Sequence, residues 1–159
     1  MRGRDPTTPP GFLQVQLGYH HLEDRPLKVQ IHAVWDKSNL ATGMGWAVSS
    51  SLAQQSQQYG AFSYTSSAIA ATAMACLKAV TWARAAGHSN IILLTSSTQL
   101  LQILQSRDYQ DITIKWTIGT LREAGLSFPS CKAFRVCRTQ ITEAQQVALW
   151  CRQHSMDFG

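Results

Sequence analysis

Carboxylate side chains are scarce in this sequence, and a large part of it has none. The 159 residues include nine Asp and Glu against fourteen Lys and Arg, which gives a formal net charge of +5. From residue 37 to residue 107, a run of 71 residues, there is no Asp and no Glu. A site for two Mg²⁺ ions needs several converging carboxylates to offset the metal charge. Such a site could therefore be assembled only from the two ends of the chain.

Signals for several other kinds of site are also missing. The sequence contains no C-x-x-C pair, no H-E-x-x-H, no G-x-S-x-G elbow and no glycine-rich phosphate loop. No apolar run approaches the roughly 20 residues of a membrane span, and the amino-terminal MRGRDPTTPP lacks the apolar core of a secretory signal. We expect an intracellular protein, nuclear or cytoplasmic, with no membrane partner. Its cysteines are expected to be reduced and mostly buried: Cys76, Cys131, Cys137 and Cys151.

What the sequence does have is a globular composition, with 45% hydrophobic and 14% charged residues. We expect a flexible arm over residues 1–26 and one domain over residues 27–156. Apolar periodicity predicts nine elements in the order βββαβααβα. The five strands are expected at 28–35, 43–50, 59–65, 90–95 and 128–138. The four helices are expected from 67 to a cap at Gly87, at 97–104, at 112–124 before Gly125, and at 142–153. The five tryptophans lie in apolar patterns and are expected in the core.

Four segments in this order resemble one known family. KVQIHAVWD (28–36) is similar to the first-strand segment K-V-N-V-D-A-A-W-D of the type 1 ribonuclease H domains common in plant genomes and their non-LTR retrotransposons. GMGWAV (43–48) resembles the second strand, G-x-G-W-V-I. The stretch 70–104 resembles the A-E-A-x-A-L helix, the following strand and the S-D-S turn. FRVCRTQITEAQQVA (134–148) resembles the last strand, the R-x-x-N-x-x-A-D turn and the closing helix.

The resemblance implies an α/β fold of the ribonuclease H-like kind. Its mixed five-stranded sheet has three antiparallel strands followed by parallel strands, and helices flank it. Active members are implied to hold two Mg²⁺ with four carboxylates and to cut the RNA strand of an RNA–DNA hybrid. None of the four carboxylates is present here, because the aligned positions are His32, Thr72, Ser96 and Gln145. The resemblance therefore predicts the fold and argues against the activity, with no catalytic residue, no metal site and no bound Mg²⁺ pair expected.

Two acidic residues lie close in sequence to these positions. Asp36 is on the same strand as His32 but about 13 Å further along it. Glu143 precedes Gln145 by two helical residues, which turns its side chain by roughly 200°, so we expect it to point away and to favour the helix amino terminus. Neither is expected to restore a metal site.

Basic residues suggest what such a domain could still bind. Lys132, Arg135 and Arg138 lie on or near the last predicted strand and are candidates for contacts with a phosphate backbone, although solvated surface charge is the simpler interpretation. The main hypothesis is an inactive ribonuclease H-like pseudoenzyme, a retroelement relic or a module that binds RNA, DNA or an RNA–DNA hybrid. The alternatives are an active hybrid ribonuclease with a rearranged metal site and a protein–protein interaction module.

Overall fold

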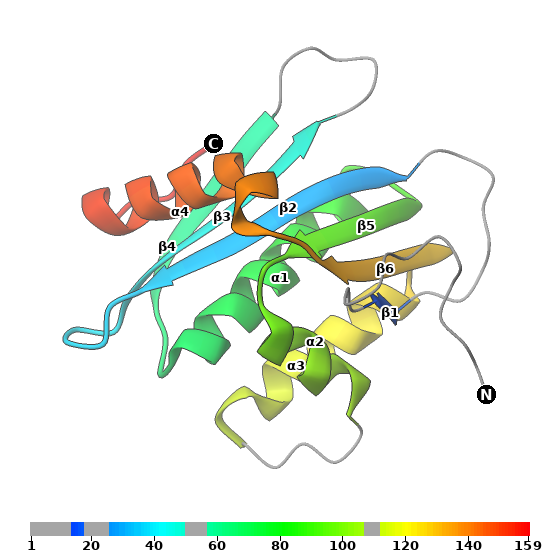
Figure 1. Ribbon diagram of the computed structural model, residues 1–159, viewed down its shortest axis with the longest axis horizontal. Coiled ribbons are helices and arrows are strands. Elements are labelled where there is room, and N and C mark those ends of the chain that lie inside the picture. The colour runs from blue at the N-terminus through cyan, green and yellow to red at the C-terminus, as the bar shows by residue number, and fades with distance from the viewer. Residues whose placement is uncertain (1–13, 18–25, 50–56, 107–111) are drawn as a thin grey trace.

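A single mixed sheet organises the chain in the computed structural model, which describes residues 14–17, 26–49, 57–106 and 112–159 (Figure 1). The strand order across the sheet is β1-β6-β5-β2-β3-β4. In chain order the strands are β1 (Gln14–Gln16), β2 (Leu27–Trp35), β3 (Ala41–Ser49), β4 (Gln57–Tyr64), β5 (Asn90–Thr95) and β6 (Ser130–Arg135).

Five of these strands confirm the predicted topology. β2, β3 and β4 form an antiparallel meander, while β5 pairs parallel to β2 and β6 pairs parallel to β5. The sixth strand, β1, was not predicted. It lies within the segment 1–26 that was expected to be an arm outside the domain, and it pairs antiparallel with β6 through Gln14–Gln16. The rest of the expected arm, apart from Leu17 and Pro26, lies outside the described residues.

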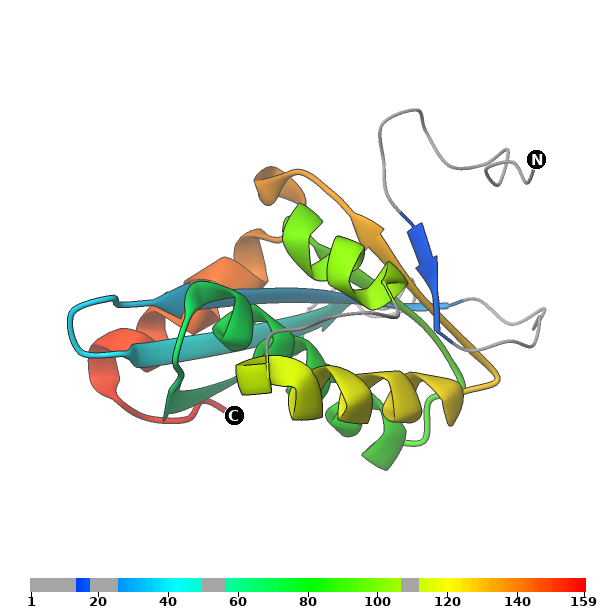
Figure 2. The same ribbon diagram turned by 90° about the horizontal axis from the view of Figure 1, so that it is seen from below.

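Helices cover both faces of the sheet. They are α1 (Ala68–Ala85), α2 (Thr98–Gln105), α3 (Ile112–Leu126), the short 3₁₀ helix η1 (Arg138–Gln140) and α4 (Thr142–His154). Figures 1 and 2 show α4 on one face, in front in Figure 1, and α1 with α3 on the other. We call these two sides the α4 face and the α1 face. In the described part of the chain no helix is long and apolar enough to span a membrane.

Local sequence signals set the ends of the first two helices. The Ser67 hydroxyl accepts a hydrogen bond from the Ala70 amide at 3.1 Å, and the Ser97 hydroxyl accepts one from the Leu100 amide at 3.1 Å. Both are side-chain caps that satisfy an amide with no partner inside the helix. Gly87, as predicted, follows the last turn of α1 with a φ of +87°, a conformation that costs glycine little.

The α1 face of the sheet carries the main core. Val29 and Ile31 of β2 and Ile91 and Leu93 of β5 are at most 1% exposed and belong to one apolar cluster with α1, α2 and α3. Alternate strand residues point to opposite faces, so β2 and β5 present their even-numbered residues to the α4 face.

Two expectations about α3 are wrong. Gly125 does not end the third helix but lies within α3, buried against the side chain of Leu17, where a Cβ would come within 2.6 Å of that residue. Trp116 is 71% exposed on α3 rather than part of the core. Two residues beyond the expected boundary at residue 156, Phe158 pairs with Gly60 of β4 through two backbone hydrogen bonds of 2.8 and 3.0 Å.

Candidate functional site

Two of the four positions aligned with the family's carboxylates lie on neighbouring strands. His32 is on β2, and Ser96 is the first residue after β5. The parallel pairing of Gln30 with Leu94, continued by two residues, brings His32 and Ser96 to the same level where β5 ends. Both residues are even-numbered, so both lie on the α4 face of the sheet. The fold therefore keeps these two positions adjacent even though neither carries an acid.

The first turn of α4 brings Gln145 towards the same region. The Gln30 side chain donates to Glu143 Oε2 at 2.6 Å and accepts from the Ala144 amide at 3.3 Å. Ala144 also lies against Gly45, the strand partner of His32, because a Cβ on Gly45 would sit 2.3 Å from the Ala144 carbonyl oxygen. Gln145 therefore follows directly after Ala144, whose backbone packs against β3 next to His32.

Thr72, the fourth position, lies on α1, on the other side of the sheet. Its hydroxyl donates to the Ala68 carbonyl at 3.1 Å, one turn back in the same helix. This is a local bond of the kind that threonine makes within helices. The Thr72 oxygen is therefore used by its own helix.

Electrostatics around His32 favour a neutral ring. His32 is half-buried, and burial lowers its pKa below the ordinary value of 6.5. The nearby positive charge of Arg138, on η1, lowers the pKa of His32 further. Both effects disfavour imidazolium, so His32 is an uncharged side chain at neutral pH.

These four residues do not fit a pair of Mg²⁺ ions. Their donors are an imidazole, two hydroxyls and an amide, none of which carries negative charge, and Mg²⁺ prefers hard, anionic oxygen ligands. Arg138 adds positive charge beside His32. Within the described ranges, no group of three or more His, Cys, Asp or Glu is placed to hold a metal ion.

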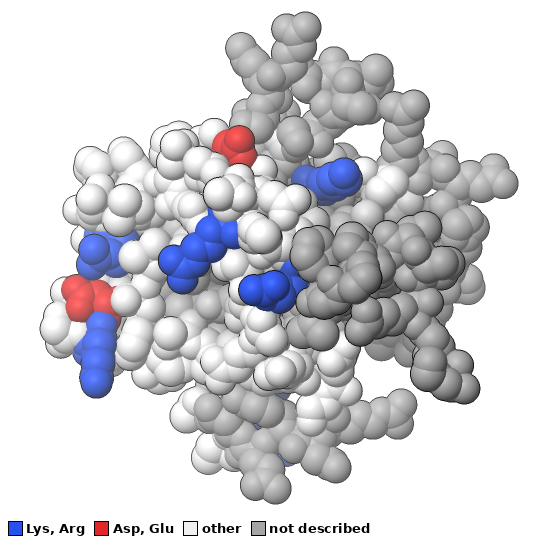
Figure 3. Space-filling view, viewed as in Figure 1, with Lys and Arg blue, Asp and Glu red and all other residues white. Residues whose placement is uncertain are grey.

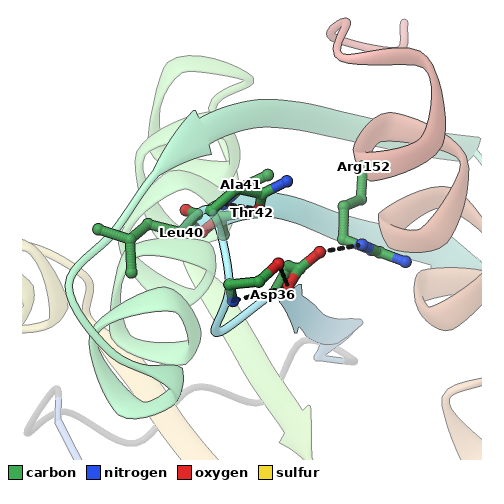
Figure 4. A network of polar contacts seen from close by, with 7 residues as sticks. Asp36, Leu40, Ala41, Thr42 and Arg152 are labelled. Carbon is green, nitrogen blue, oxygen red and sulfur yellow. Dashed lines mark hydrogen bonds and ion pairs between the residues drawn. The ribbon is translucent and has the colours of Figure 1, made fainter.

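Asp36 interacts with Ser38 and Arg152, not with the four aligned positions (Figure 4). Its carboxylate accepts from the Ser38 hydroxyl at 2.7 Å and amide at 2.9 Å, and it pairs with Arg152 near the end of α4 at 3.2 Å. The Ser38 hydrogen bonds hold the pKa of Asp36 below its ordinary value against the opposing effect of desolvation, and the Arg152 charge adds a smaller lowering. Asp36 therefore joins the β2–β3 turn to α4.

Glu143 departs from its expected orientation. It was expected to turn away from the aligned positions, yet its carboxylate lies over β2 and accepts from Gln30, two residues before His32 on the same face. Nothing in local helix geometry indicates this bond, because the two residues are 113 positions apart. Glu143 is one carboxylate, and it is already bound by an amide donor.

The structure separates the three basic candidates. Cys131 and Ala133 of β6 are buried in the core, so the alternate residue Lys132 points to the α4 face. Arg138 is exposed on η1, and its charge acts on His32, which lies on the same face. Arg135 is odd-numbered, like Cys131 and Ala133, so it lies on the core side of β6. Its Nε is buried with no hydrogen-bond partner in the described part of the chain. Lys132 and Arg138 therefore share a face that Arg135 does not.

Strand pairing adds a cation that the sequence did not indicate. Lys28 of β2 pairs with Ile92 of β5, and Ile92 pairs with Lys132 of β6. Lys28 and Lys132 therefore lie in one row across three strands on the α4 face. Figure 3 shows this side of the molecule, with blue cationic side chains spread over a mostly white surface. The signal that could have found Lys28 is the register between strands, which a single sequence does not reveal.

Comparisons with known proteins agree with this fold. The structure is similar to ribonuclease H1 from the archaeon Halobacterium salinarum, with a TM-score of 0.70 and 17% identity over 82% of this chain and 99% of that chain. It is also similar to the amino-terminal ribonuclease H domain of a Mycobacterium tuberculosis protein, with a TM-score of 0.69 and 15% identity over 79% and 98% of the two chains.

A third similar structure is a ribonuclease H1 isolated from compost by a metagenomic approach, in complex with an RNA/DNA hybrid. Its TM-score is 0.70, with 11% identity over 81% of this chain and 98% of that one.

No curated protein matches the sequence. Residues 30–151 match the family described as reverse transcriptase-like. Because that match covers most of the chain, and the strand order and the neighbouring folds agree with it, the chain belongs to the reverse transcriptase-like family and is a ribonuclease H-like domain.

Proposed function

We propose that this ribonuclease H-like domain binds nucleic acid without cleaving it. One observation carries the proposal: His32, Thr72, Ser96 and Gln145 stand where active relatives are implied to have carboxylates, while the surrounding fold is intact. Without anionic ligands, two divalent cations would face each other with no compensating charge. We infer that no Mg²⁺ pair binds and that the domain is a pseudoenzyme.

The same substitutions favour contact with a phosphate backbone. Replacing carboxylates with neutral groups removes negative potential from the surface, and Arg138 and Lys132 add positive potential on the same face. The compost ribonuclease H1 of similar fold was solved with an RNA/DNA hybrid, which supports RNA, DNA or their hybrid as the partner. Phosphate contacts of this kind make affinity fall steeply with salt.

A retroelement of the plant kind is the source that we propose for this domain, because its motifs resemble those of such ribonuclease H domains. An intracellular location, nuclear or cytoplasmic, goes with this proposal. All four cysteines are free thiols, which suits a reducing compartment.

Cleavage and binding can be measured in one experiment on the full chain. A fluorescent RNA–DNA hybrid is titrated in Mg²⁺ at low and moderate salt, with anisotropy reporting binding and a denaturing gel reporting cleavage. We expect a stable anisotropy rise that weakens with salt, and no cleavage when an active ribonuclease H run in parallel cuts fully. Mg²⁺-dependent cutting that His32→Ala abolishes would establish instead an active enzyme with a rearranged site.

A variant pair tests whether the α4 face carries the binding. Arg138→Gln should weaken hybrid binding severalfold and reduce the slope of log K against log salt by about 0.9, the value for one duplex phosphate contact. Lys115→Gln is the matched control, because Lys115 is an exposed cation of α3, on the α1 face. Equal losses in both variants would contradict a localised site.

A protein partner is the second candidate, favoured by one observation. Ile112 and Trp116, one turn apart on α3, are 81% and 71% exposed, and large apolar side chains exposed together are typical of protein contacts. The same titration separates the two candidates. If no nucleic acid raises the anisotropy even at low salt, binding to nucleic acid is excluded and a protein partner becomes the leading function.

A further inference from the structure

Part of the α4 face carries no helix among the described elements. α4 packs on β2, β3 and β4, and Figure 1 shows β5 and β6 beside it with no described helix in front of them. The two helices near β6, α2 and α3, belong to the core on the other face. The sheet surface over β5 and β6 therefore differs from the rest of this face.

The register arranges five side chains on this surface in two adjacent rows. In the first row Ile92 lies between Lys28 and Lys132, and in the second Leu94 is paired with Phe134. Four of the five side chains are half-buried, and Lys28 is exposed. We call this set the open face: Lys28, Ile92, Leu94, Lys132 and Phe134.

The open face combines two chemistries. Ile92, Leu94 and Phe134 offer an apolar and partly aromatic floor, and the two lysines stand on either side of Ile92, on the strands that flank β5. Glu143, whose carboxylate accepts from Gln30 beside Leu94, brings one negative charge to this side against the two lysines. The charge thus favours an anionic partner, and the floor favours a partner with flat, apolar groups.

We propose that the open face binds single-stranded nucleic acid, with a base stacked on Phe134 and backbone phosphates at Lys28 and Lys132. In a duplex the faces of the bases are already stacked on one another, so Phe134, Leu94 and Ile92 would gain no contact with them. Unpaired bases are free to lie on aromatic and apolar side chains of a sheet while cations hold the phosphates. The inference rests on the proposed function, and it specifies the form of nucleic acid and the place where it binds.

Binding of three fluorescent probes to the full chain tests the form of the ligand. The probes are a 12-nucleotide single-stranded RNA, the corresponding RNA–DNA hybrid and the duplex DNA, each followed by anisotropy at several salt concentrations. We expect the single strand to bind more tightly than either duplex. Tighter binding of both duplexes would overturn the inference and leave the proposed function standing, whereas no binding of any probe would overturn both.

Two matched pairs of variants test the place. Phe134→Leu keeps an apolar side chain but removes the ring, and it should weaken single-strand binding about tenfold, as expected for one stacked base. Trp116→Leu removes an aromatic ring that is more exposed but lies on α3, and it should leave binding unchanged. Combined Lys28→Gln and Lys132→Gln should reduce the slope of log K against log salt by about 1.4, the value for two single-strand phosphate contacts. Combined Lys78→Gln and Lys115→Gln, which change one cation of α1 and one of α3, should leave the slope unchanged.

A crosslink on the unmodified protein covers the case in which Phe134→Leu unfolds. Single-stranded RNA carrying 5-iodouracil is irradiated on the wild-type chain, and the attached peptide is identified by mass spectrometry. We expect attachment within β5 or β6. Attachment to α1 or α3, or unchanged single-strand affinity in a folded Phe134→Leu variant, would overturn the inference.

Discussion

On the α4 face of the sheet, β3 and β4 carry glycines where β5 and β6 carry Ile92, Leu94 and Phe134. A Cβ on Gly43 would lie 1.9 Å from the Ala148 carbonyl oxygen, and one on Gly60 would lie 2.5 Å from a methyl of Val147. The backbone of α4 therefore lies directly on the β3–β4 half. Large side chains on the other half would hold a helix further away, and none of the described helices lies there.

This difference shows how one face of a sheet can both stabilise the fold and remain available for binding. Glycines have no side chain to separate the helix from the strands, so the covered half contributes stability through close packing. On the other half Lys28 is exposed and Lys132 and Phe134 are half-buried, so part of their surface is open to the proposed ligand. Four experiments test this difference between the two halves.

The largest effect is expected where a side chain is added to the covered half. Gly45→Ala would place a Cβ 2.3 Å from the Ala144 carbonyl oxygen, which forces α4 off the sheet and should lower the free energy of unfolding by about 3 kcal/mol. Gly119→Ala is the matched control, since nothing lies within 4 Å of a Cβ there, and it should stabilise α3 by up to about 1 kcal/mol. Urea unfolding measures both. Equal midpoints for the two variants would mean that α4 does not rest on β3.

Ile91 and Ile92, neighbours on β5, allow the buried α1 face to be compared with the open face. Ile91 is fully buried on the α1 face, so Ile91→Ala should cost about 2.5 kcal/mol of unfolding free energy. Ile92 is half-buried on the open face, so Ile92→Ala should cost roughly 1 kcal/mol. The two urea midpoints give the comparison directly. Equal costs would mean that something covers Ile92 in the folded chain.

His32 lies between the two halves, and its titration reports the charge there. Because burial and Arg138 lower the pKa of His32, the folded state binds its proton less readily than the unfolded chain does. The stability from this group is present above the unfolded value, about 6.5, and is lost as the pH falls through the folded pKa. NMR titration of the ring should show the low pKa, and Arg138→Gln should raise it. An unchanged pKa in the variant would place Arg138 away from His32.

Asp36 is expected to give the smallest effect, at the far end of the covered half. Hydrogen bonds from Ser38 and the charge of Arg152 lower the pKa of Asp36, so its contribution is present above the unfolded value and is lost as the pH falls through the folded pKa. Asp36→Asn should therefore make the Tm slightly less dependent on pH in the acidic range. The same mutation at Asp157, whose carboxylate accepts from the Phe62 amide instead, serves for comparison. An acid dependence of Tm identical to that of the wild type would argue against the Asp36 interactions.

Much of the fold could be predicted from local pattern. The strand at Asn90–Thr95 and the inward residues of α4, Ala144, Val147, Ala148 and Cys151, are confirmed by the structure. Each depends on a repeat of 2 or 3.6 residues that is visible within one segment. The strand β1 was missed although Val15 and Leu17 alternate with glutamines, because so short a run does not distinguish a strand from a loop until it pairs with β6.

The order of strands and helices along the chain and the missing acids at His32, Thr72, Ser96 and Gln145 could be found without a structure, because motif spacing and residue identity are properties of the chain alone. Tertiary structure decided which side chains share a surface. It set Lys28 in a row with Lys132, separated Arg135 from Arg138, and brought Glu143 to Gln30. Strand register and helix docking join residues that are far apart in the chain, so no segment read alone contains them.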